Sequence, residues 1–161
     1  MKILSGDECS LIIRKAKLDD LERIVDFNIK IAEESEGKII DKNIVRDGVK
    51  AVLNDELKGF YLVAEKNDDS EILCGQLMIT FEWSDWRNKN IWWIQSVYVN
   101  KKYRNKKVFS QLYRTVTKMA LSEKSVGGLK LYVQKDNNSA KQVYESLGMK
   151  KAPYEIYEKP L

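Results

Sequence analysis

A short basic stretch near the middle of the chain is the first feature whose residues could do chemistry. Five cations stand within seven positions, between a strand-like apolar run and an amphipathic helix-like run: Lys101, Lys102, Arg104, Lys106 and Lys107. Nine lysines or arginines, and no acid, stand between Asp85 and Glu123, which predicts a local positive field. A nucleic acid, a membrane surface, a salt-bridged neighbour or the phosphates of a small cofactor would each supply the matching negative charge.

A second pattern lies near the carboxyl end. Asn is a preferred N-cap residue, so Asn137 is predicted to stand at the start of a helix. Apolar residues then recur at helical spacing: Ala140, Val143, Tyr144 and Leu147. Spacing alone therefore favours Tyr144 as an aromatic residue of an apolar helix face.

The composition removes several kinds of catalyst. The sequence has no histidine, which excludes Ser-His-Asp and Cys-His nucleophiles, HExxH proteases and every histidine-based metal site. Two cysteines, Cys9 and Cys74, are too few and too far apart for a zinc cluster, and Cys74 lies in an apolar run typical of a buried strand. No metal is expected, and acid–base chemistry must use Glu, Asp, Tyr, Lys, backbone groups or water.

The overall charge and the amino terminus limit the partners. A net charge of +4, from 28 cations and 24 acids, is mild for a protein that binds a polyanion, and no nucleic-acid motif occurs. No nucleic-acid partner is expected, and a basic nucleic-acid-binding domain is the weakest alternative. The segment MKILSGDECS lacks a secretory apolar core, and no window approaches the ~18 apolar residues of a membrane span. A cytoplasmic protein without a membrane partner is expected.

The elements that must position these residues follow from hydrophobic periodicity. The 161 residues, 43% of them hydrophobic, suit one domain over residues 1–161. Strands are predicted at residues 10–16, 59–67, 71–83, 90–99, 129–134 and 154–159. Helices are predicted at residues 18–37, 42–53, 108–120 and 140–147. The order β-α-α-β-β-β-α-β-α-β predicts an α/β fold with a mixed sheet flanked by helices, in which the strands at 90–99 and 129–134 run parallel.

This order and two motifs resemble a known family. Val97 and Val99 precede RNKKVF, which matches a strand L-x-V followed by [Q/R]-x-x-G-x-[G/A] and a helix, with Arg104 in the first motif position. A second motif, N-x-x-A-x-x-x-Y with a Gly-hydrophobic pair, is matched by Asn137, Ala140, Tyr144, Gly148 and Met149. The chain thus resembles the GNAT superfamily of acetyl-CoA-dependent N-acetyltransferases. Lys107 and Phe109 depart from it, because the family's loop usually has glycines there, and a Cβ limits how closely a diphosphate can approach.

The resemblance implies acetyl-CoA as cosubstrate. If Asn105 caps the third helix, the first-turn N–H groups of residues 105–110 would meet the diphosphate, and the neighbouring cations would add attraction. Backbone groups of the strand end at 97–99 would pair with the pantetheine arm, and an N–H near Val99 would polarise the acetyl carbonyl. The cofactor-binding residues predicted in this way are Val97, Tyr98, Val99, Arg104, Asn105, Lys106, Lys107, Val108, Phe109, Asn137, Ala140 and Tyr144.

The resemblance also assigns catalytic and acceptor-binding roles. Tyr144, with an ordinary pKa of about 10, is the predicted general acid for the departing thiolate. Glu82 is the predicted base, because the fourth strand carries no acid; water, or an exposed Glu82 with no special role, is the alternative. Acceptor contacts are assigned to Glu33, Glu82, Trp83, Asp85 and Trp93, an aromatic and acidic set that suits a cationic amine. Simple hairpin packing is the other reading of the tryptophans.

The predicted function is transfer of an acetyl group from acetyl-CoA to a primary amine of a small molecule or protein. A non-catalytic acyl-CoA-binding module is the main alternative, because of Lys107, Phe109 and the missing acid on the fourth strand. Exposed strand edges leave a homodimer open.

Overall fold

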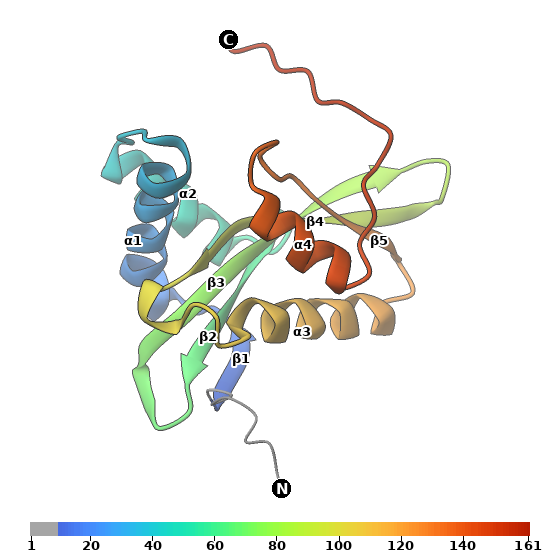
Figure 1. The fold of residues 1–161 in the computed structure, drawn as a ribbon. Coiled ribbons are helices and arrows are strands. Elements are labelled where there is room, and N and C mark those ends of the chain that lie inside the picture. The colour runs from blue at the N-terminus through green and yellow to red at the C-terminus, as the bar shows by residue number, and fades with distance from the viewer. Residues whose placement is uncertain (1–9) are drawn as a thin grey trace, which may run out of the picture. The chain divides into compact units, whose positions relative to one another are not determined.

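The computed structural model describes residues 10–161, so Cys9 lies outside the described residues (Figure 1). The chain divides into two compact units, one that ends at Leu131 and one formed by Tyr132–Leu161. The first unit contains the whole sheet and helices α1 to α3, and the second contains α4. Within the described part of the chain, no helix is both long and apolar enough to span a bilayer.

The first unit is built on a five-stranded mixed sheet with the order β1-β2-β3-β4-β5. Its strands are β1 (Leu11–Lys15), β2 (Phe60–Lys66), β3 (Asp69–Ser84), β4 (Lys89–Val99) and β5 (Val126–Leu131). The α-helices among residues 10–161 are α1 (Leu21–Ile31), α2 (Lys42–Asn54), α3 (Val108–Ser122) and α4 (Asn138–Ser146). Neighbours from β1 to β4 are antiparallel, and β4 and β5 are parallel, which confirms the predicted mixed sheet and crossover.

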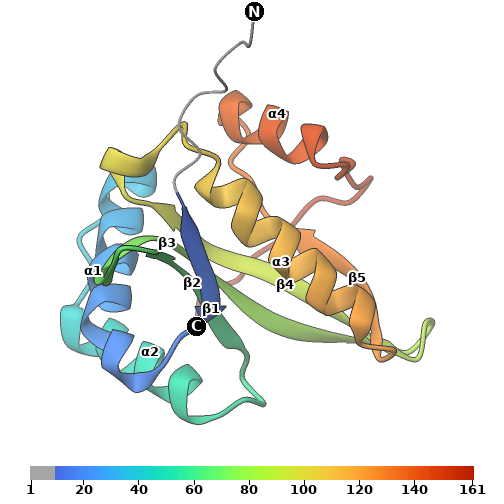
Figure 2. The same cartoon turned by 90° about the horizontal axis from the view of Figure 1, so that it is seen from below.

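Helices cover both faces of the sheet, with α1 and α2 on one side and α3 on the other (Figure 2). Strand β2 shows why, because five successive residues from Tyr61 to Glu65 are buried and side chains alternate between the faces. Tyr61 and Val63 pack with Ile24 and Phe27 of α1. Such a continuous apolar strand is typical of the interior of a layered fold, and it fixes the register of its neighbours.

Two predicted strands differ from the structure. The fifth strand lies at Val126–Leu131 rather than at 129–134, because its parallel ladder with β4 begins at the Asn90–Val126 pair. The strand predicted at residues 154–159 is wrong, since these residues form no strand and Tyr154, Ile156 and Tyr157 are exposed. Alternation gives a segment strand propensity, but a strand also needs a neighbouring ladder to pair with.

The predicted first helix also changes character near its end. Regular α-helix stops at Ile31, and a π-helical segment, Ala32–Glu36, continues it. Gly37 then ends the helix in the left-handed conformation, with a φ of 62°. The π-helical segment carries Glu33 and Glu34, so the change of helix type alters which of these acids reaches the sheet.

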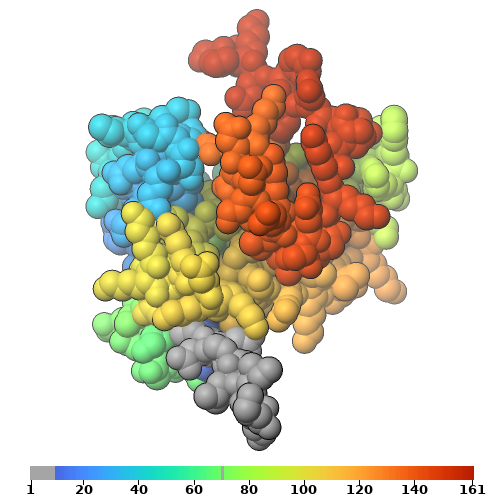
Figure 3. All heavy atoms as spheres, viewed as in Figure 1, coloured from blue at the N-terminus to red at the C-terminus, as the bar shows by residue number. Residues whose placement is uncertain are grey.

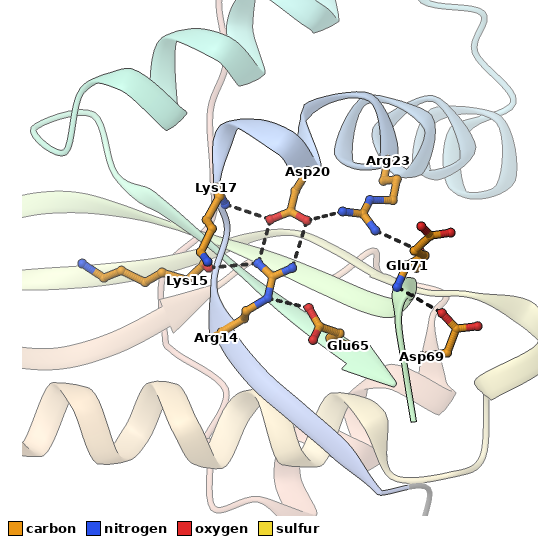
Figure 4. A network of polar contacts seen from close by, with 8 residues as sticks. All are labelled: Arg14, Lys15, Lys17, Asp20, Arg23, Glu65, Asp69 and Glu71. Carbon is orange, nitrogen blue, oxygen red and sulfur yellow. Dashed lines mark hydrogen bonds and ion pairs between the residues drawn. The ribbon is translucent and has the colours of Figure 1, made fainter. Parts of the chain in front are cut away.

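A buried carboxylate joins the start of α1 to the sheet (Figure 4). Asp20 is 1% exposed and accepts hydrogen bonds from Arg14 at 2.7 and 3.0 Å, from Arg23 at 2.7 Å and from the Lys17 backbone N–H at 2.8 Å. Arg14 also donates to Glu65 of β2 at 2.6 Å. Burial raises the pKa of Asp20, but these hydrogen bonds and the two guanidinium charges outweigh it and hold the pKa below its ordinary value.

Replacing Asp20 by Asn is expected to lower the free energy of unfolding by roughly 3 kcal/mol at pH 7, because it leaves the two guanidinium groups without their shared anion. Urea unfolding followed by tryptophan fluorescence measures the change. Because the pKa of Asp20 is lowered on folding, its contribution is full above the unfolded value and fades as pH falls through the folded value. The difference between the two proteins should therefore shrink in acid.

The matched control is Asp26→Asn, which removes an exposed ion pair with Lys30 on the same helix. That pair is expected to contribute no more than about 0.5 kcal/mol. Equal losses in the two variants would contradict the special weight given to Asp20.

Candidate active site

A β-bulge in β4 shapes the first unit's candidate site. Gln76 pairs with Tyr98, but Met78 pairs with Gln95, so the single residue Leu77 lies opposite two residues of β4, Ser96 and Val97. Ser96 adopts the left-handed conformation, with a φ of 48°. Pairing between β4 and β5 ends at Ile94, so the described strands leave residues 95–99 paired with β3 alone. A bulge of this kind bends the strand and redirects its side chains.

A glycine on β3 allows α3 to lie close to this part of β4. A Cβ on Gly75 would stand 2.8 Å from the Tyr98 carbonyl oxygen and 3.1 Å from a methyl of Val108. Real Cβ atoms do not come so close to backbone oxygen, so any other residue would push β4 or α3 away. Val108 is 2% exposed and points into the core, which leaves only its backbone for a ligand.

The loop before α3 contains two left-handed residues, Asn105 with a φ of 62° and Lys107 with a φ of 58°. Lys107, and not Asn105, is the N-cap, and the helix begins at Val108, so the predicted cap is corrected. Asn tolerates this conformation because its short polar side chain bonds locally, and Asn105 therefore forms the turn ahead of the cap. Alternating backbone conformations beside a helix N-terminus aim N–H groups at an anion, so the loop fits a diphosphate.

Arg104, the first residue of the loop motif, is held by the fold itself. Its Nε donates to the Val99 carbonyl at 3.0 Å, and a terminal nitrogen donates to Glu34 at 2.6 Å. Glu34 also accepts from the Tyr98 hydroxyl at 3.0 Å and forms an ion pair with Lys101 at 3.3 Å. In Figure 3 the yellow loop lies on the surface beside the blue helical segment. We call Glu34 and its three donors, Tyr98, Lys101 and Arg104, the Glu34 clasp.

The clasp shifts the ionisation of both acids in it. The hydrogen bond from Arg104, followed by those from Tyr98 and Lys101, outweighs burial and lowers the pKa of Glu34. Burial, together with the hydrogen bond to Glu34, raises the pKa of Tyr98 to about 12. At neutral pH the Glu34 carboxylate is therefore ionised and the Tyr98 hydroxyl is protonated, as the contact requires.

The remaining loop residues lie around the start of α3. Lys106 lies over the Tyr103 ring at 5.6 Å, and Phe109 lies against the Tyr113 ring at a centroid distance of 6.1 Å. Both contacts lie within the loop and α3, so the cation–π pair and the ring pair stiffen this segment locally.

A polar and aromatic strip lies on the face of the sheet that also carries α1. Glu82 accepts from the Trp93 indole at 2.6 Å and from Lys130 at 2.8 Å, and Lys130 lies over the Trp93 ring. Hydrogen bonds from Lys130 and then Trp93 lower the pKa of Glu82 below its ordinary value. Glu82 is therefore ionised at neutral pH but is a weaker proton acceptor than a free carboxylate.

The other residues predicted to bind the acceptor do not join this strip. Alternation places Trp83 on the opposite face of β3 from Glu82, and Trp83 is 60% exposed. Asp85 lies in the turn between β3 and β4, where it accepts from the Trp86 backbone N–H. Glu33 lies in the π-helical segment, and its neighbour Glu34 is the acid that reaches the sheet.

The second unit contains the other predicted motif. Asn137 is the N-cap of α4 and its side-chain oxygen accepts from the Ala140 backbone N–H at 3.0 Å, as the sequence predicts. Tyr144 lies one turn beyond Ala140 on the same helix, and burial raises the pKa of its phenol above the ordinary value. The helix ends at Ser146, and Gly148 is left-handed, with a φ of 89°.

Sequence reasoning missed the contacts that two residues make in the first unit's site. Glu34 contacts Tyr98 and Arg104, which lie 64 and 70 positions away in the sequence. No local sequence pattern predicts a contact over such a separation. Gln76 is a fully buried polar residue on β3, and the only available signal was a polar residue inside an apolar strand.

The sequence matches the acetyltransferase (GNAT) family over residues 26–149. The fold is similar to that of a possible acetyltransferase from Clostridium difficile 630, with 44% identity, a TM-score of 0.86 and coverage of 94% of this chain and 97% of the other. It is also similar to a predicted acetyltransferase with acetyl-CoA from Clostridium acetobutylicum, with 16% identity, a TM-score of 0.73 and coverage of 93% and 96%. A comparison with curated proteins finds no match.

The family match covers well over half of the chain, and the strongly similar structure covers nearly all of it. The chain therefore belongs to the GNAT family and is an acetyl-CoA-dependent N-acetyltransferase. This confirms the family, the fold class and the acyltransferase activity predicted from the sequence, and an amine acceptor follows from the family.

Replacing Lys107 by Gly is expected to raise the free energy of unfolding by about 1 kcal/mol, because the left-handed conformation costs a residue with a Cβ roughly that amount. Urea unfolding measures the change. Lys106→Gly is the matched control, because it removes the same charge at a neighbouring residue whose φ is not positive. It should lower stability, by up to about 1 kcal/mol. Equal changes in the two variants would contradict the strain assigned to Lys107.

Proposed function

We propose that the protein transfers the acetyl group of acetyl-CoA directly to a primary amine of a small molecule or protein, with Tyr144 as general acid. The observation that supports this most is the combination, in the first unit, of a bulged β4 that leaves β5 and a left-handed, basic loop before α3. The first offers main-chain groups to an extended amide arm, and the second offers N–H groups and cations to phosphates.

Each predicted cosubstrate contact has a stated task. Backbone groups of Val97, Tyr98 and Val99 would pair with the pantetheine amides, and the first-turn N–H groups from Val108 onward would meet the diphosphate. Lys106 and Lys107 add positive charge, whereas Arg104 acts by fixing the loop through Glu34 and Val99. Acetyl-CoA brings the activated acetyl group as a thioester.

The reaction is a single displacement at the thioester carbonyl. The neutral amine nitrogen attacks the carbonyl carbon, a C–N bond forms and the C–S bond breaks. The Tyr144 phenol gives its proton to the departing thiolate, the extra proton on the nitrogen passes to water, and the Tyr144 phenolate then regains a proton from water. Burial raises the pKa of Tyr144, so the phenol holds its proton at neutral pH until the thiolate requires it.

The strip of Glu82 and Trp93 is our candidate for acceptor binding. An ionised carboxylate beside an indole ring attracts a cationic amine before it loses its proton, and the amine would take the place that the Lys130 ammonium group holds here. The lowered pKa of Glu82 weakens it as a base, so we assign it to amine binding and assign proton removal to water. Trp83, Asp85 and Glu33 stay predictions of acceptor contact from the sequence.

Replacing Tyr144 by Phe is expected to lower kcat roughly 100-fold, the usual contribution of a positioned general acid, with little change in the KM for acetyl-CoA. Thiol release is measured over a panel of an aminoglycoside, a polyamine, an amino acid and a peptide amine. Tyr157→Phe, at an exposed tyrosine of the same unit, is the control and should keep the wild-type rate. An unchanged rate in the Tyr144 variant would remove this residue from the mechanism.

Replacing Glu82 by Gln is expected to raise the KM for the amine about tenfold, since a lost charge-assisted contact is worth about 1.4 kcal/mol, and to leave kcat within about threefold. Steady-state kinetics with the best amine of the panel measure both constants. Glu56→Gln, at an exposed acid of the turn before β2, is the matched control. A large fall in kcat with an unchanged KM would instead identify Glu82 as the base.

A further inference from the structure

Three polar side chains and one backbone carbonyl meet on the α1 side of the sheet at the bulge of β4. They come from four different elements: Asn28 from α1, Tyr61 from β2, Gln76 from β3 and Ser96 from β4. Asn28 donates to the Tyr61 hydroxyl at 3.1 Å, and Gln76 donates to Asn28 at 2.8 Å. We call them the bulge cluster.

Gln76 is the member that contacts the bulge itself. Its side-chain nitrogen uses both hydrogens, one toward Asn28 Oδ1 and one toward the Ser96 carbonyl oxygen at 3.3 Å. Ser96 is one of the two residues that share a single partner on β3, so the bulge disturbs the regular ladder there. The Gln76 amide thus supplies a side-chain donor to backbone that the bulge displaces.

Stability alone does not account for a glutamine at this position. Gln76 is fully buried next to the apolar core of Val63 and Tyr98. Its Oε1 is, among the described residues, the one buried side-chain polar atom with no hydrogen-bond partner. Burying an unsatisfied polar atom is costly, and an apolar residue of the same size would avoid that cost. The glutamine is therefore better explained by what it does to the backbone of β4.

We propose that Gln76 is a positioning residue for acetyl transfer, which holds the Ser96 bulge in one conformation and so fixes the backbone of Val97 to Val99. This inference rests on the proposed function, in which that backbone binds the pantetheine arm and polarises the acetyl carbonyl. Gln76 acts through β4 and does not touch the substrate. Asn28 and Tyr61 orient its amide from the side of α1.

Gln76→Met tests the proposal, because the unbranched thioether keeps the length of the side chain and removes the donor. The melting temperature should stay close to that of the wild type, since an unpaired buried oxygen is lost together with the hydrogen bonds. The kcat for thiol release with the best amine of the panel should fall roughly 10- to 100-fold, the effect expected when reacting groups are misplaced by a fraction of an ångström to one ångström. The KM for acetyl-CoA should rise by a smaller factor than kcat falls, because the pantetheine contacts of β4 are disturbed while the diphosphate contacts of the loop before α3 are unchanged.

Val49→Ala is the matched control for a general loss of stability. Val49 is the buried core residue of α2, 2% exposed, and is not part of the bulge cluster. This variant should lower the melting temperature and keep the wild-type kcat at a temperature where it is folded. The proposal thus predicts opposite results for the two variants: Gln76→Met keeps its melting temperature and loses kcat, whereas Val49→Ala loses melting temperature and keeps kcat.

Gln76→Glu gives a second readout in case the first variant folds poorly. A protonated carboxyl can donate one hydrogen bond, as the amide does, whereas an ionised carboxylate cannot. Burial raises the pKa of a carboxyl, so the ratio of variant to wild-type kcat should fall as pH rises between roughly 5 and 9. The titratable groups around the site are Tyr61 and Tyr98, whose pKa values are raised, and Glu34, whose pKa is lowered, so none of them titrates in that interval.

The outcomes separate this inference from the proposed function. A Gln76→Met protein with wild-type kcat, or a Gln76→Glu ratio that does not depend on pH, overturns the role of Gln76 while the acetyltransferase proposal stands. A wild-type protein that binds no acetyl-CoA by calorimetry and releases no thiol with any amine of the panel overturns both. Loss of kcat with a retained melting temperature supports the positioning role.

Discussion

The extra residue in β4 is the constraint on which the candidate site depends. Before the bulge, Gln95 lies opposite Met78, which packs against the α1 core; after it, Tyr98 takes the same face. Without the extra residue, alternation would turn Tyr98 toward α3, and its hydroxyl could not reach Glu34. One inserted residue, just beyond the last pair of β4 with β5, therefore directs the side chain that ties the strand end to the π-helical segment.

The basic loop needs a counter-charge, because its own cations repel one another. Five cations in seven residues repel one another, and a glycine-rich loop would bring main-chain N–H groups to phosphates with less charge. Here a single carboxylate, Glu34, binds Arg104, Lys101 and the Tyr98 hydroxyl together. Isolated surface ion pairs contribute little to stability, but one acid shared by three donors is ordered by all of them. The clasp thus fixes the backbone of the basic loop, whereas a loop rich in glycine would be flexible.

The sequence predicted what depends on local periodicity, and missed what depends on distant contacts. Strands β2 to β4 and helix α2 lie within a few residues of their expected positions, because alternation and helical spacing are strong there. The strand predicted at residues 154–159 failed, because propensity does not supply a partner. Trp83 lies on the opposite face of β3 from Glu82, because neighbouring residues of a strand point to opposite faces, and its contact with the acceptor stays a prediction. Glu34 and Gln76 act across long sequence separations, and a single sequence does not reveal such pairs.

Asn137 shows how one motif residue can be accounted for by two different roles, a helix cap and a contact with the cosubstrate. Its side-chain oxygen caps α4 through the Ala140 N–H, so local helix chemistry alone would favour an asparagine there. The cap needs only the oxygen, however, and aspartate or serine would serve it as well. Only the amide adds two hydrogens that the cap does not use, and these can donate to a carbonyl of an extended amide arm. An asparagine rather than another capping residue therefore suits our proposal that this position also binds the cosubstrate, and Tyr144 follows it at seven residues, two turns along the same helix.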